Sequence, residues 1–354
     1  MTAPHTSQAL LVLPRLRVQN ANAISSPLTH GFPSITAFMG LMWALQRKLA
    51  TQGIPLQLMQ VGVVCHHHEE QVVDGYVKSF RLTRNPLDKD GSTAAIVEEG
   101  RIHLDITLVF LVTERADTAP QAPALVQGNG VQMQEWAREI GRIVASMRIA
   151  GGTVLPTRPA PRQRTRPWME VLPEDSEAQA RDFALWRRRW LPGYALVGRD
   201  DLLAARLVHL REHQPDASLL NAWLHASRFN HAPQTPSGSE VDTPAPSSAK
   251  QPWGDPLRGK GTGWTVPIPV GYAALDGEPL PAGTVANARD AGTPLAFVES
   301  VYSLGEWISP HRLRRVQDLL WRAETDTAMR LYRCRSGYTP AGAPQSVEQM
   351  PEFD

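Results

Sequence analysis

The chain has 354 residues, of which 42% are hydrophobic and 20% are charged, so it is long enough for two domains or for one core with large insertions. Its formal net charge is +1, which excludes nucleic-acid binding through an overall positive field and leaves only local positive patches. The chain has only two cysteines, Cys65 and Cys334, which excludes a disulfide framework and a cysteine zinc site. No apolar run is long enough to span a membrane, so we expect a cytoplasmic protein without membrane contact.

The first predicted elements are a strand and a helix joined by a long connection. An apolar run at residues 9–18 predicts a strand, and Pro14 within it indicates either an edge strand or a bulge. Ser34 is a suitable N-cap for a helix at residues 35–49, where apolar residues recur every three or four positions. Gly53 is a suitable stop for this helix.

The connection at residues 15–33 is rich in amide, hydroxyl and guanidinium groups. Such side chains can hold phosphates and base edges without covalent chemistry. Alternatively, they form a polar loop whose side chains cap their own backbone. The candidate contact residues in this connection are Arg15, Arg17, Asn20, Asn22, Ser25 and Ser26.

A second strand is predicted at residues 56–70, and it carries the strongest metal-like pattern of the chain. On a strand, His66, His68 and Glu70 share one face, and this set can bind zinc or iron. No further ligand group matches it, so a polar strand end is the better interpretation. His30 offers an alternative chemistry, as a general base for RNA cleavage, but it has no identified partner. The sequence therefore predicts no metal, no cofactor and no catalytic set.

The periodicity is lost at residues 73–99, which predicts a protruding hairpin or loop. Asp90 and Gly91 form a tight-turn signal within it. Its candidate contact residues are Arg81, Arg84, Asn85 and Lys89. Residues 101–113 then alternate between apolar and polar side chains, which predicts a half-buried strand.

A linker at residues 116–130 precedes a helix at 131–148 and a short strand at 153–155. The first 155 residues thus have the order strand, helix, strand, strand, helix, strand. This order is typical of α+β proteins of the ferredoxin-like and RNA-recognition-motif type.

The second half of the chain holds the strongest positive clusters. One comprises Arg158, Arg162, Arg164 and Arg166 before Trp168, and the other comprises Arg187, Arg188 and Arg189 between Trp186 and Trp190. They indicate either phosphate contacts with aromatic neighbours or a solvated helix face balanced by nearby acidic residues.

The rest of the second half alternates between predicted strands, helices and linkers. Strands are predicted at 194–197 and 264–272, helices at 202–210, 219–227 and 312–322, and a strand or helix start at 295–303. A flexible linker is predicted at 232–263 and a frayed tail after 338.

Six segments resemble one known family: residues 13–34 (LPRLRVQNANAISSPLTHGFPS), 80–104 (FRLTRNPLDKDGSTAAIVEEGRIHL), 147–156 (MRIAGGTVLP), 191–199 (LPGYALVGR), 286–300 (ANARDAGTPLAFVES) and 304–312 (LGEWISPHR). This is the Csy-two family, the Cas-five-type (RAMP) subunits of type I-F CRISPR surveillance complexes, or Cascade. The resemblance implies an RRM-like RAMP domain at 9–156 with a thumb-like insertion at about 73–99, a basic, mainly helical region at 157–231, the linker at 232–263, and strands and a helix at 264–338 that complete the fold.

The resemblance also implies a non-catalytic role in antiviral defence. The chain would bind the 5′ handle of the CRISPR RNA with the large subunit, next to the adjacent backbone subunit, and meet target DNA through the complex. The residues that match family motifs outside the first half include Arg289 and Arg312, whose role as RNA contact, subunit contact or structural residue stays open. An alternative is a RAMP-type endoribonuclease that processes CRISPR repeat RNA, with His30 or one of the histidines at 66–68 as the base.

Overall fold

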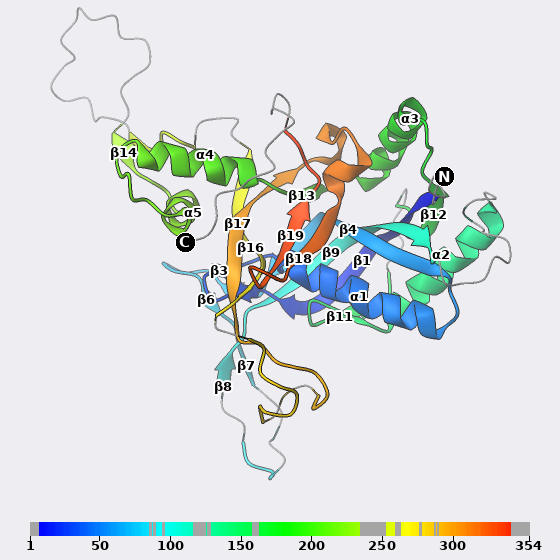
Figure 1. The fold of residues 1–354 in the computed structure, drawn as a ribbon, viewed down its shortest axis with the longest axis horizontal. Coiled ribbons are helices and arrows are strands. Elements are labelled where there is room, and N and C mark those ends of the chain that lie inside the picture. Colours follow the sequence, from blue (N-terminus) through cyan, green and yellow to red (C-terminus); the bar gives the residue numbers. More distant parts are fainter. Residues whose placement is uncertain are drawn as a thin grey trace, which may run out of the picture.

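One large antiparallel sheet organises the protein, together with five α-helices in the described part of the chain (Figure 1). The computed structural model describes residues 7–84, 87, 90–93, 96–115, 125, 129–157, 163–233, 253–258, 263–275, 278–286, 288 and 290–340. The helices are α1 (Ile35–Thr51), α2 (Gly130–Ala145), α3 (Ser176–Trp186), α4 (Asp200–Arg211) and α5 (Leu219–Ser227). No helix of these residues is long and apolar enough to cross a membrane.

The sheet has 11 strands. They are β1 (Gln8–Asn22), β4 (Leu56–Glu70), β9 (Arg101–Glu114), β10 (Arg148–Ile149), β11 (Gly152–Leu155), β12 (Trp168–Val171), β13 (Tyr194–Gly198), β16 (Trp264–Ala274), β17 (Val298–Ile308), β18 (Trp321–Asp326) and β19 (Leu331–Ser336). Their order is β10-β11-β1-β9-β4-β13-β17-β16-β19-β18, and β12 pairs with β1. Strands from both ends of the sequence therefore share one sheet.

The first strand is bent at the predicted proline. The pairing of β1 with β9 shifts register between Leu13 and Leu16, and Arg15 there has φ +55°. Pro14 thus lies in a bulge, where a missing N–H donor disrupts no regular ladder. The edge alternative is wrong, because β1 pairs with β9 on one side and with β11 and β12 on the other.

The predicted end signals of α1 are confirmed. The side chain of Ser34 accepts a hydrogen bond from the backbone N–H of Thr36, and Gly53 follows the helix with φ +71°. The predicted apolar stripe is buried: Ile35, Phe38, Met42, Leu45 and Leu49. Side chains of α1 and α2 pack into one core with the same face of β1, β4 and β9.

The strand β9 differs from the half-buried prediction in its second half. Residues 107–113 are all buried. Leu108 and Phe110 face the core beneath α1 and α2, whereas Val109 and Leu111 face a second core with Phe183, Trp186 and Trp190 of α3 and the 3-10 helix η1 (Arg187–Trp190). The prediction was therefore wrong for residues 107–113, because α3 and η1 cover the face that alternation assigned to solvent.

The insertion between β4 and β9 forms two short ladders that project from one end of the sheet (Figure 1). They pair β5 (Val72–Val73) with β6 (Ser79–Phe80), and β7 (Leu82–Arg84) with β8 (Ile96–Glu98). The predicted hairpin is confirmed to this extent. The contact candidates Asn85 and Lys89 lie outside the described residues, and so does most of the predicted linker at 116–130.

The predicted helix at 312–322 is wrong. This segment contains two 3-10 turns, η2 (Pro310–Arg312) and η3 (Val316–Leu319), before β18 begins at Trp321. The buried carboxylate of Asp318 accepts hydrogen bonds from the backbone N–H groups of Arg314 and Arg315, which fixes a short turn in place of a longer helix. The open choice at 295–303 resolves to a strand, since β17 begins at Val298.

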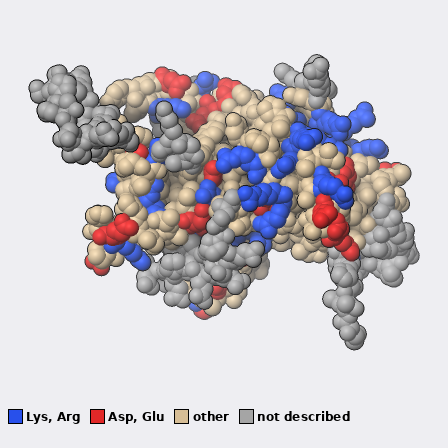
Figure 2. Space-filling view, turned by 90° about the horizontal axis from the view of Figure 1, so that it is seen from above, with Lys and Arg blue, Asp and Glu red and all other residues tan. Residues whose placement is uncertain are grey.

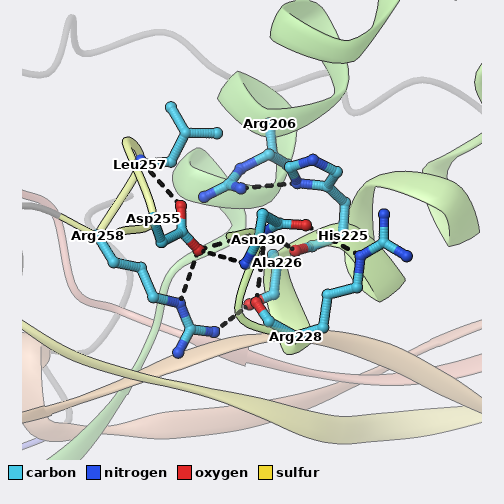
Figure 3. Close-up of polar contacts among 8 residues, drawn as sticks. All are labelled: Arg206, His225, Ala226, Arg228, Asn230, Asp255, Leu257 and Arg258. Carbon is cyan, nitrogen blue, oxygen red and sulfur yellow. Dashed lines mark hydrogen bonds and ion pairs between the residues drawn. The ribbon is translucent and has the colours of Figure 1, made fainter. Parts of the chain in front are cut away.

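The helices α4 and α5 form a separate small core beside β17, with Leu203, Leu207 and Trp223 buried in it. The segment 253–258, which lies within the predicted flexible linker at 232–263, is instead anchored beside these helices through Asp255 (Figure 3). Asp255 is 3% exposed and accepts hydrogen bonds from the backbone N–H groups of Asn230 and Leu257, each at 2.9 Å. Residues 234–252 of the predicted linker lie outside the described residues.

Candidate nucleic-acid interface

A pocket of about 540 Å³ opens between the connection that follows β1, the end of β4, and the strands β13, β16 and β17. We call it the aromatic pocket, because Phe32, Tyr194, Trp264 and Trp307 line it. Phe32 meets Trp307 edge to face, with ring centroids 4.8 Å apart, and Tyr194 meets Trp264 in the same way at 6.0 Å. Trp264 remains 52% exposed and Tyr194 49% exposed. Exposed aromatic rings of this kind are platforms on which nucleic-acid bases stack.

One wall of the aromatic pocket holds His66 in a hydrogen-bond chain. Its Nδ1 lies 2.7 Å from the carbonyl oxygen of Pro192, which can only accept, so Nδ1 carries the proton. Its Nε2 lies 2.7 Å from Oγ1 of Thr107 and therefore accepts from that hydroxyl, which itself accepts from the backbone N–H of Arg15. Burial, with a contribution from Arg15, lowers the pKa of His66 below its ordinary value. Both ring nitrogens of His66 are thus occupied within the protein.

The other histidines considered in the sequence analysis lie in different surroundings. The ring of His30 packs against Phe80 at the base of the projecting ladders, with centroids 4.9 Å apart. His68 is exposed. Among the described residues, no three His, Cys, Asp or Glu side chains are grouped so that they could hold a metal ion.

The polar connection after β1 is stabilised largely by its own side chains. The short strands β2 (Ile24–Ser26) and β3 (Thr29–His30) pair with each other. The hydroxyls of Ser25 and Ser26 each lie 2.7 Å from Oγ1 of Thr29, and the amide of Asn22 bonds both backbone groups of Ile24. The self-capping interpretation of this loop is therefore confirmed for Asn22, Ser25 and Ser26.

A second hollow, of about 470 Å³, lies at the base of the projecting ladders, and we call it the thumb-base groove. It is lined by Gln19, Asn20, Gln71, Arg81, Glu99, Arg101, Arg148, Gly151 and Thr153. Arg81 donates to Oε1 of Gln71 at 3.0 Å, and Arg148 donates to the carbonyl oxygen of Gly151 at 3.1 Å. These contacts hold the guanidinium groups in place and leave N–H donors for a phosphate.

A third hollow, also of about 470 Å³, connects the first two, and we call it the connecting hollow. It shares Ser25 and Pro33 with the aromatic pocket, and it shares Arg148 and Gly151 with the thumb-base groove. The connecting hollow therefore adjoins both of the others, and we call the three hollows together the path. Aromatic rings lie at one end of this path and guanidinium groups at the other.

The structure distributes the predicted contact residues unevenly. Asn20 and Arg81 line the thumb-base groove, and Asn22 and Ser25 line the connecting hollow. Ser26 is buried. Arg15 points inward, where its side chain is 11% exposed and pairs with Asp105 at 3.4 Å.

The other predicted residues lie elsewhere. Arg17 donates to the carbonyl oxygen of Pro156, and Arg312 on η2 lines none of the three hollows. The side chain of Arg84 and all of Arg289 lie outside the described residues.

Sequence reasoning missed several residues of this path. The aromatic residues Tyr194, Trp264 and Trp307 come from three distant segments, so no local pattern connects them. Arg101, Arg148, Tyr194 and Trp307 carried a usable signal, since all four lie within the motifs that resemble the Csy-two family. Arg101 also falls on the polar side of the alternating pattern of β9.

Comparison with known proteins identifies the family. The family described as "CRISPR-associated protein (Cas_Csy2)" matches residues 11–334 of this chain. The chain belongs to the Csy2 family. A relative named "CRISPR-associated protein Csy2" from Pseudomonas aeruginosa (strain UCBPP-PA14) is 45% identical over 333 residues, which cover 92% of this chain and 94% of the relative. The resemblance drawn from the sequence motifs is confirmed, and the Csy2 match includes every residue that lines the three hollows.

Proposed function

We propose that this chain is a non-catalytic subunit of the type I-F CRISPR surveillance complex. In this role it binds the 5′ handle of the CRISPR RNA together with the large subunit and adjoins the neighbouring backbone subunit. The observation that supports the proposal most is the row of three adjoining hollows from the aromatic pocket to the thumb-base groove. The path offers stacking surfaces and phosphate donors in sequence, and a single-stranded RNA presents both bases and phosphates to such a surface.

The topology supports a RAMP-type fold. Among the first strands, β11, β1, β9 and β4 lie side by side in that order, with all neighbours antiparallel. In chain order these are the fourth, first, third and second main strands, and α1 and α2 cover one face. We infer a ferredoxin-like unit from this arrangement, in which the ladders β5–β6 and β7–β8 form the thumb.

Each end of the path has a distinct task in this proposal. Trp264 and Tyr194 stack handle bases, and their apolar rings accept any base. Arg81, Arg101 and Arg148 bind the backbone phosphates near the thumb, where they position the RNA. Asn20 and Gln19 lie in the same groove and offer amides to base edges or to the 2′-hydroxyl.

The proposed lack of catalysis rests on the histidines. His66 has both ring nitrogens bonded within the protein, so it has no free lone pair with which to take a proton from an RNA 2′-hydroxyl. Cleavage by an endoribonuclease needs such a base within hydrogen-bond reach of that hydroxyl. His30, His67 and His68 remain as candidate bases, and all three line the aromatic pocket.

The test is reconstitution with the large subunit and a CRISPR RNA that carries a type I-F repeat. We expect a stoichiometric complex that retains intact RNA. The pair Arg101→Ala and Arg148→Ala should weaken RNA binding about tenfold and reduce the slope of log affinity against log salt by about 1.4, since each lost single-strand phosphate contact contributes about 0.7. Arg47→Ala with Lys48→Ala is the matched control, because both side chains are exposed on α1, outside the path.

Two outcomes contradict the proposal. Equal RNA affinity for the wild type and the Arg101 and Arg148 pair removes the RNA-binding assignment of the path. Metal-independent cleavage of repeat RNA by the wild type that disappears in His30→Ala, His67→Ala or His68→Ala replaces the non-catalytic role with an endoribonuclease.

A further inference from the structure

A separate groove of about 490 Å³ lies beside β12 and α2, and we call it the arginine groove. It is lined by Gln134, Arg138, Gln163, Arg164, Thr165, Arg166, Pro167, Trp168, Glu170 and Arg189. It shares no lining residue with the aromatic pocket, the connecting hollow or the thumb-base groove. Trp168 pairs with Val12 of β1, whereas the thumb-base groove contains Gln19 of the same strand, so the two sites are about 20 Å apart along β1 at ~3.3 Å per residue.

The arginine groove carries an excess of positive charge. Arg138, Arg164 and Arg166 are exposed, and none of them forms an ion pair with any described residue. Among the described residues that line the groove, Glu170 is the only carboxylate, and it is already bonded to Arg189 at 3.2 Å and to the indole N–H of Trp186. The charge of Glu170 is thus balanced by Arg189, and the guanidinium groups of Arg138, Arg164 and Arg166 line the groove without a carboxylate partner in the part of the chain that the structure describes.

One part of the groove is rigidly held. The guanidinium of Arg189 lies over the ring of Trp168, 4.9 Å from its centroid, while it also bonds Glu170. A side chain held by stacking and by a hydrogen bond loses little entropy when it binds a ligand. The groove therefore combines one fixed cation with three that can adjust to a partner.

The positive surface continues from the groove across η1. Arg188 is exposed on η1, and Arg187 beside it donates to the carbonyl oxygen of Leu313, which joins η1 to the turns η2 and η3. Arg312 on η2 and Arg314 between η2 and η3 are both exposed. Figure 2 looks down on this side of the molecule and shows Lys and Arg side chains gathered over its centre and right. The charge is therefore spread along a strip rather than confined to one point.

We propose that the arginine groove and this strip bind the phosphodiester backbone of nucleic acid at a second place, separate from the RNA path. A single small anion would engage one or two guanidinium groups, whereas a row of backbone phosphates neutralises charges that are spread along a surface. The ring of Trp168 and the amides of Gln134 and Gln163 add the aromatic and hydrogen-bonding groups that contact sugars and bases. The source of the phosphates is either duplex DNA or the guide RNA.

The experiment measures binding of the full chain to two fluorescent probes, a short mixed-sequence DNA duplex and a CRISPR RNA, at salt concentrations from about 50 to about 200 mM. The test variant is Arg164→Ala with Arg166→Ala, and the matched control is Arg47→Ala with Lys48→Ala. Each pair removes two exposed positive charges that have no ion-pair partner among the described residues. Circular dichroism verifies that both variants keep the wild-type fold.

We expect the Arg164 and Arg166 pair to bind at least one probe about tenfold more weakly than the control does. On the duplex, the slope of log affinity against log salt should fall by about 1.8, since each lost contact contributes about 0.9. A loss confined to the duplex assigns the groove to DNA, and a loss confined to the RNA assigns it to the guide. Arg164→Lys with Arg166→Lys should restore much of the affinity, because it restores the charge.

Three results overturn the proposal. Equal affinities of both variants and the wild type for both probes leave the groove without a nucleic-acid role. Equal losses in the test and control pairs mean that only total charge matters. Unchanged binding to both probes with weaker retention of the large subunit assigns the groove to a protein partner. The Arg101 and Arg148 pair serves as an independent reference, because its effect on RNA binding tests the proposed function and not this groove.

Discussion

At the residue scale, His66 shows how a reactive side chain becomes a structural one. The sequence places it in a triplet of histidines beside Glu70, a pattern that also fits a metal site. In the structure its two nitrogens bridge Pro192 and Thr107, and so connect β4 to β9 and to the turn before β13. No local pattern predicts these partners, because they lie 126 and 41 residues away.

The pKa of His66 gives a pH prediction. The folded pKa is lowered from 6.5, so below pH 6.5 the unfolded chain takes up a proton that the folded chain does not. The contribution of His66 to stability is therefore complete above about pH 6.5 and falls as the pH decreases toward the folded pKa. We expect His66→Gln to lower the free energy of unfolding by about 1 kcal/mol at neutral pH and to remove this part of the acid decline.

Urea unfolding at a series of pH values from about 8 to about 5 measures this effect. His213→Gln is the control for removing one histidine, since His213 is exposed on the turn after α4. Parallel pH profiles of His66→Gln and the wild type would show that His66 does not couple protonation to folding.

Asp255 gives a second prediction at this scale. Burial alone would raise its pKa, but the N–H groups of Asn230 and Leu257 outweigh burial and lower the pKa of the carboxyl below its usual range (Figure 3). Its contribution to stability is therefore present above about pH 4 and is lost as the pH falls through the folded pKa. Asp255→Ala leaves these donors unpaired and should cost about 1–3 kcal/mol near pH 7.

Hydrogen exchange of residues 253–258 and urea unfolding measure this loss together. We expect faster exchange of the segment in Asp255→Ala, and a difference from the wild type that shrinks as the pH falls below about 4. Asp216→Ala is the control, because Asp216 is exposed and forms no hydrogen bond or ion pair with the described residues. An equal loss in both variants would mean that Asp255 does not anchor the segment.

At the element scale, local signals predicted the elements whose ends and faces are decided locally. The cap at Ser34, the stripe of α1 and the stop at Gly53 depend on neighbours within a few residues, and all were predicted. The second face of β9 was not, because α3 and η1 lie more than 60 residues further along the chain. The uninterrupted apolar run at 108–112 was the available signal, since strands covered on both faces read as continuous runs.

The turns η2 and η3 show the same limit at the other end of the chain. Residues 316, 319 and 320 have apolar spacings that also suit a helix, yet their side chains pack into the core that includes Val64 of β4 and Val197 of β13. The close packing of η3 against β4 depends on Gly62 of β4, which has no side chain. A Cβ at Gly62 would lie 2.5 Å from Cγ of Leu319 and 2.9 Å from its carbonyl oxygen.

This contact predicts opposite effects for two Gly→Ala substitutions. Gly62→Ala forces η3 away from β4 and should cost about 1–3 kcal/mol of the free energy of unfolding. Gly40→Ala, on the exposed side of α1 with no atom within 4 Å of its Cβ, should add up to about 1 kcal/mol through helix propensity. Thermal unfolding midpoints of both variants measure the contrast, and a midpoint of Gly62→Ala at or above that of the wild type would contradict the packing argument.

At the scale of the whole molecule, the candidate site depends on topology that no motif encodes. The aromatic pocket takes Phe32, Tyr194, Trp264 and Trp307 from segments that only the shared sheet brings together. The sequence identified the polar connection after β1 and the basic thumb, which flank the path, and the family resemblance indicated RNA as the ligand. It did not distinguish donors that bond their own loop, such as Ser26, from donors that line an open groove, such as Arg148.

The separation of the two proposed nucleic-acid sites leads to a prediction for the whole molecule. The thumb-base groove and the arginine groove share no lining residue and lie about 20 Å apart along β1 at ~3.3 Å per residue. We therefore combine the Arg101→Ala and Arg148→Ala pair with the Arg164→Ala and Arg166→Ala pair in one fourfold variant. On each probe, its change in binding free energy should equal the sum of the changes that the two pairs cause separately, to within about 0.5 kcal/mol. Because the net charge of the chain is only +1, no overall field couples the two sites at physiological salt.

Binding free energies of the wild type, both pairs and the fourfold variant, measured on one RNA probe and one duplex probe at a single salt concentration, complete this cycle. An interaction energy above about 1 kcal/mol on either probe would mean that one nucleic acid contacts both grooves at once. The two sites would then be parts of a single surface that follows β1 from the thumb to β12. If the effects are additive on both probes, and each pair weakens the binding of a different probe, the protein binds two nucleic acids at opposite ends of β1.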